Sequence, residues 1–504
     1  MVLGAFFATA ASVPWRRSLL LLPTLALLWQ LCRLLHRLWW RPRCLERELR
    51  SKGLRGTSYR FLTGDLREQG RRNKDAWSRP LPLRCHDIAP RVAPLLCDSV
   101  REHGKVSLSW FGPIPKVTIA DPELAKSVLS DKSGHFEKPK FPALWKLLAN
   151  GLLNHEGEKW VKHRRLLNPA FHLEKIKVPV SVSVSVSVHI LREPFTAIQL
   201  TCGMEYDSAV HAARVFGVLR RVGGQMDGVH RLQWRSLPTP NNKRMYQVNN
   251  EVESILHGLI AKRTKAIKEG ESTKDDLLGL LLESNMRHTY DNGQSSMGMT
   301  NEDVIEECKT FYFAGMETTS VLLMWTMIVL SMHPEWQDRA REEVLSLFGK
   351  NKPGYEGLNR LKTVTMILYE VLRLYPPSIH FSRKTCKKVL IGDKRYPAGM
   401  MIELSVLLMH HDPDIWGSDV HEFKPERFAE GISKASRNSG AFLPFGWGPR
   451  ICIGQNFALA EAKMAICMIL QRFDFVLAPS YTHAPYTVVT LHPMHGAQIR
   501  LGLI

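Results

Sequence analysis

The sequence predicts a mainly α-helical protein with small β-sheets, preceded by an N-terminal membrane-anchor helix. Long helical patterns alternate with short apolar segments typical of strands, and the helical patterns predominate. No Gly/Ser-rich or Pro-rich linker divides the chain after residue 60, so we expect residues 41–504 to form one large domain. With 504 residues, 44% of them hydrophobic, the chain can bury a substantial core.

The anchor is predicted from residues 18–35 (SLLLLPTLALLWQLCRLL), an apolar run interrupted only by Gln30 and Arg33. A basic, Trp-rich stretch follows at residues 37–43, as at a membrane interface. A cleaved signal peptide and a buried core helix are the alternatives, but no small-residue cleavage site follows the run. Residues 1–40 are therefore expected to anchor the chain, with the body in the cytosol.

Charge and cysteine content restrict the partners and the compartment. The net charge of +20 favours nucleic acid, an anionic membrane or an acidic protein partner. No recognition helix, zinc finger or aromatic-interleaved basic stripe is evident, so we expect no nucleic-acid partner. The nine cysteines are scattered without a C-x-x-C pair, which fits neither a disulfide framework nor a structural zinc site and indicates a reducing compartment.

Several elements can be predicted individually. Residues 111–120 are expected to form strands joined by a turn, and Asp121 is expected to cap a helix over residues 122–129. Residues 248–268 and 301–333 show the clearest helical patterns. Residues 412–428, rich in Pro, Asp and Trp, are expected to form an ordered loop.

Residues 178–237 differ in character from the rest of the chain. They begin with VPVSVSVSVSV, a two-residue repeat that nominally makes a strand. We expect no genuine strand there, because residues 177–183 can be encoded as a splice-donor-like AAG|GT followed by a pyrimidine-rich simple repeat. Residues 215–229 can be back-translated so that a one-nucleotide shift gives a better helix. We therefore interpret residues 178–237 as the translation of a retained intron or of a shifted reading frame, and a genuine insertion is the alternative.

The strongest motif is residues 445–454, FGWGPRICIG, followed by a helical pattern. A thiolate that ligates iron must be shielded and within reach of backbone N–H donors, and glycines let the loop fold tightly beneath a flat macrocycle. Cys452 suits this role, although a buried structural cysteine is the usual alternative. The F-x-x-G-x-R-x-C-x-G spacing resembles the haem-binding loop of the cytochrome P450 family.

This resemblance extends over most of the chain and implies the cytochrome P450 fold, a triangular helical prism around haem b. It makes Cys452 the metal ligand and Arg450 a partner of a haem propionate. Phe445 is expected to pack near the sulfur, while Gly446 and Gly454 shape the loop.

A second match lies in the helix at 301–333, where residues 314–319 read AGMETT. Glycine weakens the helical ladder and Thr can bond to a backbone carbonyl, so a local distortion is expected. The resemblance implies that Ala314 and Gly315 make room for dioxygen, and that Thr318 and Glu317 are catalytic groups that deliver protons.

Other matches are structural or contact the cofactor. Glu370 and Arg373 lie three apart on one helical face, and the resemblance joins them to Arg427 in a buried network that supports the cysteine loop. Trp160 and Arg164 resemble the family's helix that reaches a propionate, but Arg165 leaves the register open. Arg383 resembles a strand arginine with the same task.

Within the family, the sequence is most similar to the plant microsomal group that contains secologanin synthase, by residues 157–177, 311–344 and 410–428. This likeness implies a monooxygenase of the endoplasmic reticulum membrane that inserts one atom of O2 into a C–H bond of an apolar, terpenoid-like molecule. Electrons would come from NADPH through NADPH–cytochrome P450 reductase. A haem-thiolate isomerase or dehydratase and a non-functional product of a mis-spliced gene are the alternatives.

Overall fold

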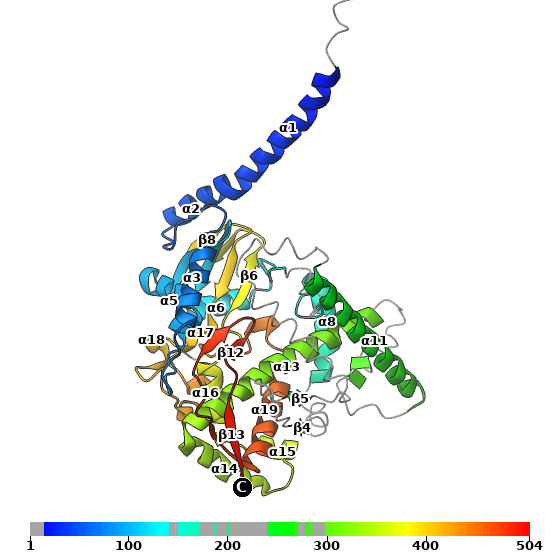
Figure 1. Cartoon of the computed structure of the whole chain (residues 1–504), viewed down its shortest axis with the longest axis vertical. Coiled ribbons are helices and arrows are strands. Elements are labelled where there is room, and N and C mark those ends of the chain that lie inside the picture. Colours follow the sequence, from blue (N-terminus) through cyan, green and yellow to red (C-terminus); the bar gives the residue numbers. More distant parts are fainter. Residues whose placement is uncertain are drawn as a thin grey trace, which may run out of the picture.

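The structure is a computed structural model that shows a helix-rich body with a long N-terminal helix extending from it (Figure 1). The residues that it describes are 15–140, 147, 150–171, 185–187, 199–201, 239–270, 278–279, 281–282, 285, 298–438 and 440–504.

The apolar N-terminal run forms helix α1 (Trp15–Leu35), which continues through a π-helical turn (His36–Trp40) into α2 (Arg41–Ser51). Figure 1 shows α1 pointing away from the body. From residue 23 on, its large side chains are exposed, with Leu27 at 69% and Trp29 at 64%. An exposed apolar surface of this kind marks a site of protein or membrane interaction.

The main sheet has five strands in the order β1-β2-β9-β6-β3. The predicted hairpin is confirmed, although its first strand begins earlier than residue 111 and the turn lies at residues 112–113. Strand β2 pairs in parallel with β9, which joins the N-terminal and C-terminal parts of the body. The strands are β1 (Val106–Phe111), β2 (Ile114–Ile119), β3 (Phe136–Glu137), β6 (Phe381–Thr385) and β9 (Met401–Leu404).

Two-stranded antiparallel ladders complete the sheet structure of the described residues. They are β4 (Ser185–Ser187) with β5 (Gln199–Thr201), β7 (Val389–Ile391) with β8 (Lys394–Tyr396), β10 (Phe473–Leu477) with β13 (Ile499–Leu503), and β11 (Pro485–Thr487) with β12 (Leu491–Pro493).

Helix α13 (Asn301–Met332) runs through the body (Figure 1) and confirms the predicted helix, ending one residue early. A capping box starts it: the Thr300 hydroxyl accepts from the Asp303 N–H, and the Asp303 carboxylate accepts from the Thr300 N–H. By length and composition α13 could also cross a membrane, but 56% of its most apolar window is buried inside the body. It is therefore a core helix.

The core surrounds the apolar half of α13, where Trp325 stacks on Tyr375 with ring centroids 4.3 Å apart. Burial of these large side chains supplies most of the driving force for folding. The helices that follow α13 are α14 (Pro334–Phe348), α15 (Tyr355–Leu358), α16 (Thr363–Leu374), α17 (Val406–His410), α18 (Pro413–Trp416) and α19 (Gln455–Leu470).

Two predicted helices before α13 are confirmed, and one is longer than expected. The Asp121 carboxylate accepts from the Leu124 N–H and caps α6 as predicted. Helix α11 begins at Pro240, because the Thr239 hydroxyl caps it by accepting from the Asn242 N–H. The helices here are α3 (Leu66–Trp77), α4 (Ala89–Val92), α5 (Pro94–His103), α6 (Pro122–Leu129), α8 (Gly157–Leu167) and α11 (Pro240–Lys268).

Two segments were predicted as irregular. Residues 412–428 are mainly loop, as expected, with the short α18 and a 3₁₀ turn (Pro425–Phe428) at their ends. Other 3₁₀ turns are Asn168–Phe171, Ile432–Lys434 and Gly448–Arg450. The interpretation of residues 178–237 falls mostly outside the described residues, but the expectation of no strand is wrong at β4, where the alternating Ser-Val repeat finds a partner strand in β5.

Candidate functional site

The cysteine loop is tightly closed by its own backbone. The Cys452 N–H donates to the Phe445 carbonyl at 2.9 Å. Gly446 and Gly448 have φ angles of +77° and +73°, in the region that favours glycine. A Cβ at Gly448 would lie 2.4 Å from the Leu129 carbonyl oxygen, so the loop can pack against the end of α6 only with glycine there.

The Cys452 side chain is exposed, although protein atoms surround the sulfur closely. Desolvation by these atoms raises the pKa of the Cys452 thiol, whereas the Gly454 N–H, Arg164 and Lys138 lower it. Gly454 is also the N-cap residue of α19, so the positive end of that helix dipole faces the sulfur's neighbourhood. An accessible sulfur with an N–H donor and cations nearby suits a thiolate ligand.

Gly454 itself has no tight contact in this structure. A Cβ there would approach only Phe171, at an ordinary 3.9 Å. Packing among the described protein atoms therefore does not demand glycine at position 454. Phe445, by contrast, packs against the core cluster around α13, and its predicted packing near the sulfur stays a prediction.

Four cationic side chains gather near Cys452: Lys138, Arg164, Arg383 and Arg450. Burial lowers the pKa of Lys138 to about 7, with added repulsion from Arg450 and Arg383. Burial likewise lowers the pKa of Arg383 to about 10, with Arg450 contributing. So many cations in one partly desolvated region favour an anionic ligand.

The predicted residues of α8 lie at this site, and of the two adjacent arginines Arg164 is the one that faces the cysteine loop. Arg164 Nη1 donates to the Ile451 carbonyl at 2.9 Å, next to Cys452, whereas Arg165 is exposed. The guanidinium of Arg450 lies over the Trp160 ring, 4.4 Å from its centroid. Trp160, Arg164 and Arg450 thus lie together beside the cysteine loop, and their predicted contact with a haem propionate stays a prediction.

The remaining charged residues near Cys452 include one that the sequence predicted, Arg383, and two that it did not, Lys138 and Glu156. Arg383 lies on β6, 9% exposed, with Nη1 donating to the Ser382 carbonyl at 2.9 Å. Sequence reasoning missed Lys138 and Glu156. The Glu156 carboxylate pairs with Arg450 and accepts from the Lys138 backbone N–H at 3.1 Å. Both lie in short irregular segments without a periodic pattern that could have indicated them.

Helix α13 carries the predicted oxygen-side residues. The Thr318 hydroxyl donates to the Ala314 carbonyl at 2.6 Å, the side-chain bond from which the distortion was expected, and helix α13 continues through this point. A Thr hydroxyl inside a helix can donate to the carbonyl four residues earlier, which already accepts a backbone hydrogen bond of the helix. A Cβ added to Gly315 would meet nothing within 4 Å, so this side of the helix is open to a ligand.

The Glu317 side chain contacts the hairpin formed by β11 and β12 near the C-terminus. Its Oε1 accepts from the Thr490 hydroxyl and from His492 Nε2, each at 2.7 Å. Thr318 and Glu317 are thus engaged with different partners. Thr490 and His492 could not be predicted as partners of Glu317, because they reach α13 only through the tertiary fold.

The predicted buried network is assembled. Arg373 donates to both carboxylate oxygens of Glu370 at 2.8 and 2.7 Å, and both side chains are fully buried. Arg427 Nε lies 3.4 Å from Glu370 Oε1. Arg373 Nη1 also donates to the His410 carbonyl at 3.0 Å, and His410 Nε2 accepts from the Leu443 N–H at 3.1 Å. This chain of contacts links the ion pair to the segment that leads into the cysteine loop.

Together these residues fit a flat iron macrocycle with two carboxylates. Cys452 offers an accessible sulfur with a backbone N–H donor, and the four cations offer partners for carboxylates. Gly315 leaves the facing helix free of a side chain. The arrangement suits haem with a thiolate ligand.

Comparisons with known proteins agree with this geometry. A family model described as Cytochrome P450 matches residues 94–197 and 218–492, and the interruption lies inside residues 178–237. Cytochrome P450 CYP72A616 of Paris polyphylla is 50% identical over 488 residues, covering 92% of this chain and 94% of that protein. The 11-oxo-beta-amyrin 30-oxidase of Glycyrrhiza uralensis is 44% identical over 497 residues, covering 93% of this chain and 95% of that protein.

Proposed function

Because this chain belongs to the cytochrome P450 family and is a monooxygenase with a haem-iron cofactor, we propose that it oxidises an apolar, terpenoid-like molecule. One atom of O2 enters a C–H bond of the substrate, and electrons come from NADPH through NADPH–cytochrome P450 reductase. The observation that carries the proposal is the accessible Cys452 sulfur beside four cationic side chains. The triterpenoid substrate class is supported by the relative named for oxidising 11-oxo-beta-amyrin.

Several residues would hold haem b. Cys452 would be the iron ligand, and Lys138, Arg164, Arg383 and Arg450 would bind the propionates. Bound haem supplies the activation of dioxygen and the oxidation of the C–H bond, while the protein tunes it through the thiolate and the surrounding hydrogen bonds. Trp160 would hold Arg450 in place, and Phe445 and Gly446 would support the cysteine loop. Ala314 and Gly315 would lie on the helix that faces the haem and leave room for dioxygen.

Two side chains of α13 would handle protons. Thr318 holds a proton at Oγ1, already placed by its bond to the Ala314 carbonyl. Glu317 Oε1 accepts hydrogen bonds from Thr490 and His492, so the Glu317 carboxylate could take up and release protons while connected to the hairpin of β11 and β12. Proton transfer by positioned groups contributes about 10²–10⁴-fold to a reaction rate.

The body would lie on the cytosolic side of the endoplasmic reticulum membrane. The exposed leucines and Trp29 of α1, with Trp39 and Trp40 in the turn that follows, support residues 1–40 as the anchor. The net charge of +20 supports association with an anionic membrane surface and with an acidic region of the reductase.

The function is tested by expressing the chain with the reductase in microsomes and supplying 11-oxo-beta-amyrin and related triterpenoids under ¹⁸O2. The expected result is a product that contains one ¹⁸O atom and forms only with NADPH and the reductase. A rearranged product that forms without either, and without ¹⁸O, would instead establish an isomerase or dehydratase.

Lys138→Met is expected to weaken haem retention, because a neutral side chain cannot pair with a propionate. Loss of a hydrogen bond to a charged group, about 1.5–3 kcal/mol, corresponds to about tenfold to a hundredfold faster haem loss. The measurement is haem transfer to an excess of a scavenger protein at neutral pH. Lys140→Met, an exposed lysine two residues away, is the control and should leave the rate unchanged.

The pH dependence of the haem-free protein provides a second readout for Lys138. Its folded-state pKa of about 7 lies below the ordinary 10.5, so its unfavourable contribution to folding is complete below pH 7. That contribution diminishes as the pH rises from 7 to 10.5. The haem-free Lys138→Met variant should lack this gain in stability, and an unchanged pH profile would contradict the assignment.

Thr318→Ala is expected to separate NADPH consumption from product formation. Without the Oγ1 proton, product formed per NADPH should fall by about tenfold to a hundredfold, while NADPH consumption continues. Thr318→Ser should restore most of the yield. Ser320→Ala is a matched control, because Ser320 makes the same kind of bond to the Met316 carbonyl at 2.6 Å. Equal losses in the two alanine variants would indicate a helix effect only.

A further inference from the structure

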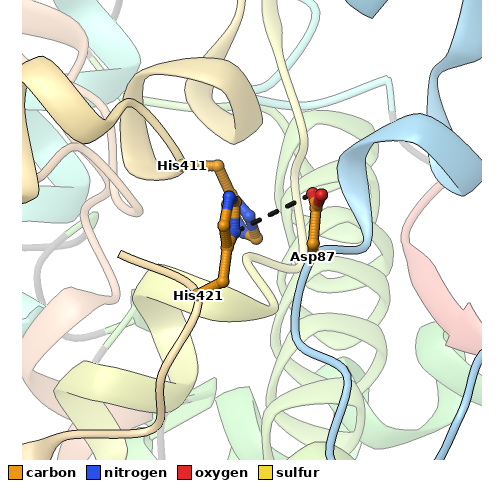
Figure 2. Close-up of side chains that lie close together, drawn as sticks. All are labelled: Asp87, His411 and His421. Atoms are coloured by element: carbon orange, nitrogen blue, oxygen red, sulfur yellow. Dashed lines mark ion pairs between the residues drawn. The ribbon is translucent and has the colours of Figure 1, made fainter. Parts of the chain in front are cut away.

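Three side chains outside the proposed haem site, one buried and two partly exposed, lie close together (Figure 2). Asp87 lies just before α4, His411 directly after α17, and His421 in the loop after α18. His421 Nδ1 is 3.8 Å from an Asp87 carboxylate oxygen. One ligand atom from each residue lies within 4.8 Å of the other two. Two imidazoles and a carboxylate thus meet from segments more than 300 residues apart.

His411 is the most constrained of the three. It is 6% exposed, and its Nε2 lies 3.0 Å from the Leu374 carbonyl oxygen. A carbonyl only accepts, which assigns the proton to Nε2 and leaves a lone pair on Nδ1. That Nδ1 is buried and has no hydrogen-bond partner, a condition that costs about 1–3 kcal/mol. Metal-binding histidines have this arrangement, with the second ring nitrogen donating to a backbone carbonyl.

The other two residues complete a donor set. His421 Nδ1 is also buried without a hydrogen-bond partner. The side chains of His421 and Asp87 are 41% and 44% exposed, so they have room to close on an ion. Burial, with Arg373 nearby, lowers the pKa of His411 well below its ordinary value and keeps the imidazole neutral, as ligation requires.

We propose that Asp87, His411 and His421 bind a divalent transition-metal ion of the zinc class. Two imidazole nitrogens and one carboxylate oxygen suit Zn²⁺, with water as the fourth ligand. Mg²⁺ and Ca²⁺ prefer sites made of oxygen ligands, so they are disfavoured here. The site needs no haem chemistry and is distinct from the cysteine loop.

The position of the site indicates a structural role. Both histidines adjoin carbonyls that accept hydrogen bonds from Arg373: those of His410 at 3.0 Å, Val420 at 2.8 Å and Glu422 at 3.3 Å. An ion bound here would fasten the segment before α4 to the loop that encloses Arg373. The bound ion should therefore stabilise the network that supports the cysteine loop.

A second cluster of possible ligands, His155, His163 and Glu307, is largely occupied by the protein's own bonds. His163 Nδ1 lies 2.6 Å from Glu307 Oε1, and Glu307 Oε2 accepts from the Leu152 N–H at 2.8 Å. His155 Nε2 lacks a hydrogen-bond partner there, but both carboxylate oxygens of Glu307 are already engaged, whereas His411 and His421 each keep an unpartnered Nδ1. This difference favours the Asp87 site.

Zinc binding to the full-length haem-loaded protein tests the proposal. The chelator-treated protein would be dialysed against buffered Zn²⁺, and bound zinc counted by elemental mass spectrometry. The expected result is one tight ion per chain, with affinity weakened at least about tenfold in Asp87→Asn and in His421→Ala. His495→Ala, which removes an exposed histidine elsewhere, should bind zinc as the unaltered chain does.

Thermal unfolding gives an independent readout. Zinc should raise the melting temperature of the unaltered chain and of His495→Ala, and should leave that of Asp87→Asn unchanged. These variants alter half-exposed side chains, so they avoid the folding risk of replacing buried His411. Equal zinc affinity in the unaltered chain, Asp87→Asn and His421→Ala would overturn the proposal.

Discussion

Cys452→Ser is expected to abolish oxygenation, with turnover reduced by at least about a thousandfold, as for other residues at a reacting centre. A serine hydroxyl stays protonated at neutral pH and cannot supply the thiolate that the iron requires. The measurement is product formation per haem in reconstituted microsomes. The loop itself should still fold, because the backbone bond from residue 452 to Phe445 does not involve the side chain.

Cys386→Ser is the matched control for this substitution. Cys386 is partly buried, and its sulfur lies 3.8 Å from the Lys384 carbonyl oxygen and within hydrogen-bonding reach of the Glu137 side chain, away from the cysteine loop. Its replacement should leave turnover within a factor of about two, as for most surface substitutions away from a site. Substantial product formation by Cys452→Ser would remove Cys452 from the reaction.

Glu370→Gln is expected to destabilise the body by about 3–5 kcal/mol, because it leaves the fully buried Arg373 without its counter-charge. Haem retention should decline with stability, since Arg373 is connected through His410 to the segment before the cysteine loop. Denaturant unfolding followed by the Soret band measures both effects together.

An exposed ion pair provides the comparison for the buried one. Arg339 and Glu426 are 3.1 Å apart with about half of each side chain exposed, at 51% and 49%. Glu426→Gln removes this pair and leaves Arg339 over the Trp336 ring, and it should cost at most about 1 kcal/mol, because solvent screens such pairs. Equal destabilisation by Glu370→Gln and Glu426→Gln would contradict the structural role of the buried network.

Features set by local chemistry could be predicted from the sequence. Asp121 before Pro122 gave the cap of α6, and the apolar pattern gave α13 almost to the residue. The E-x-x-R spacing placed Glu370 and Arg373 on one helical face, where the structure joins them. The glycines around Cys452 indicated a tight loop, and two of them have positive φ angles.

Features set by contacts between distant segments could not be predicted. Lys138 and Glu156 reach the site from irregular segments, and the parallel pairing of β2 with β9 joins residues nearly 300 positions apart. Thr490 and His492 reach Glu317 only when the C-terminal hairpin packs on α13. A pattern within one short window carries no information about such partners.

The most direct test of Cys452 as the haem ligand is the carbon monoxide difference spectrum of reduced microsomes that contain the unaltered chain. A strongly red-shifted Soret band is expected, since a thiolate ligand donates electron density to the iron. A band without the red shift in a haem-loaded protein would contradict thiolate ligation. If the unaltered chain gives no band and a chain in which residues 178–237 are replaced by a regular family sequence does, the failure lies in that segment. If neither chain gives a band, the haem site is contradicted.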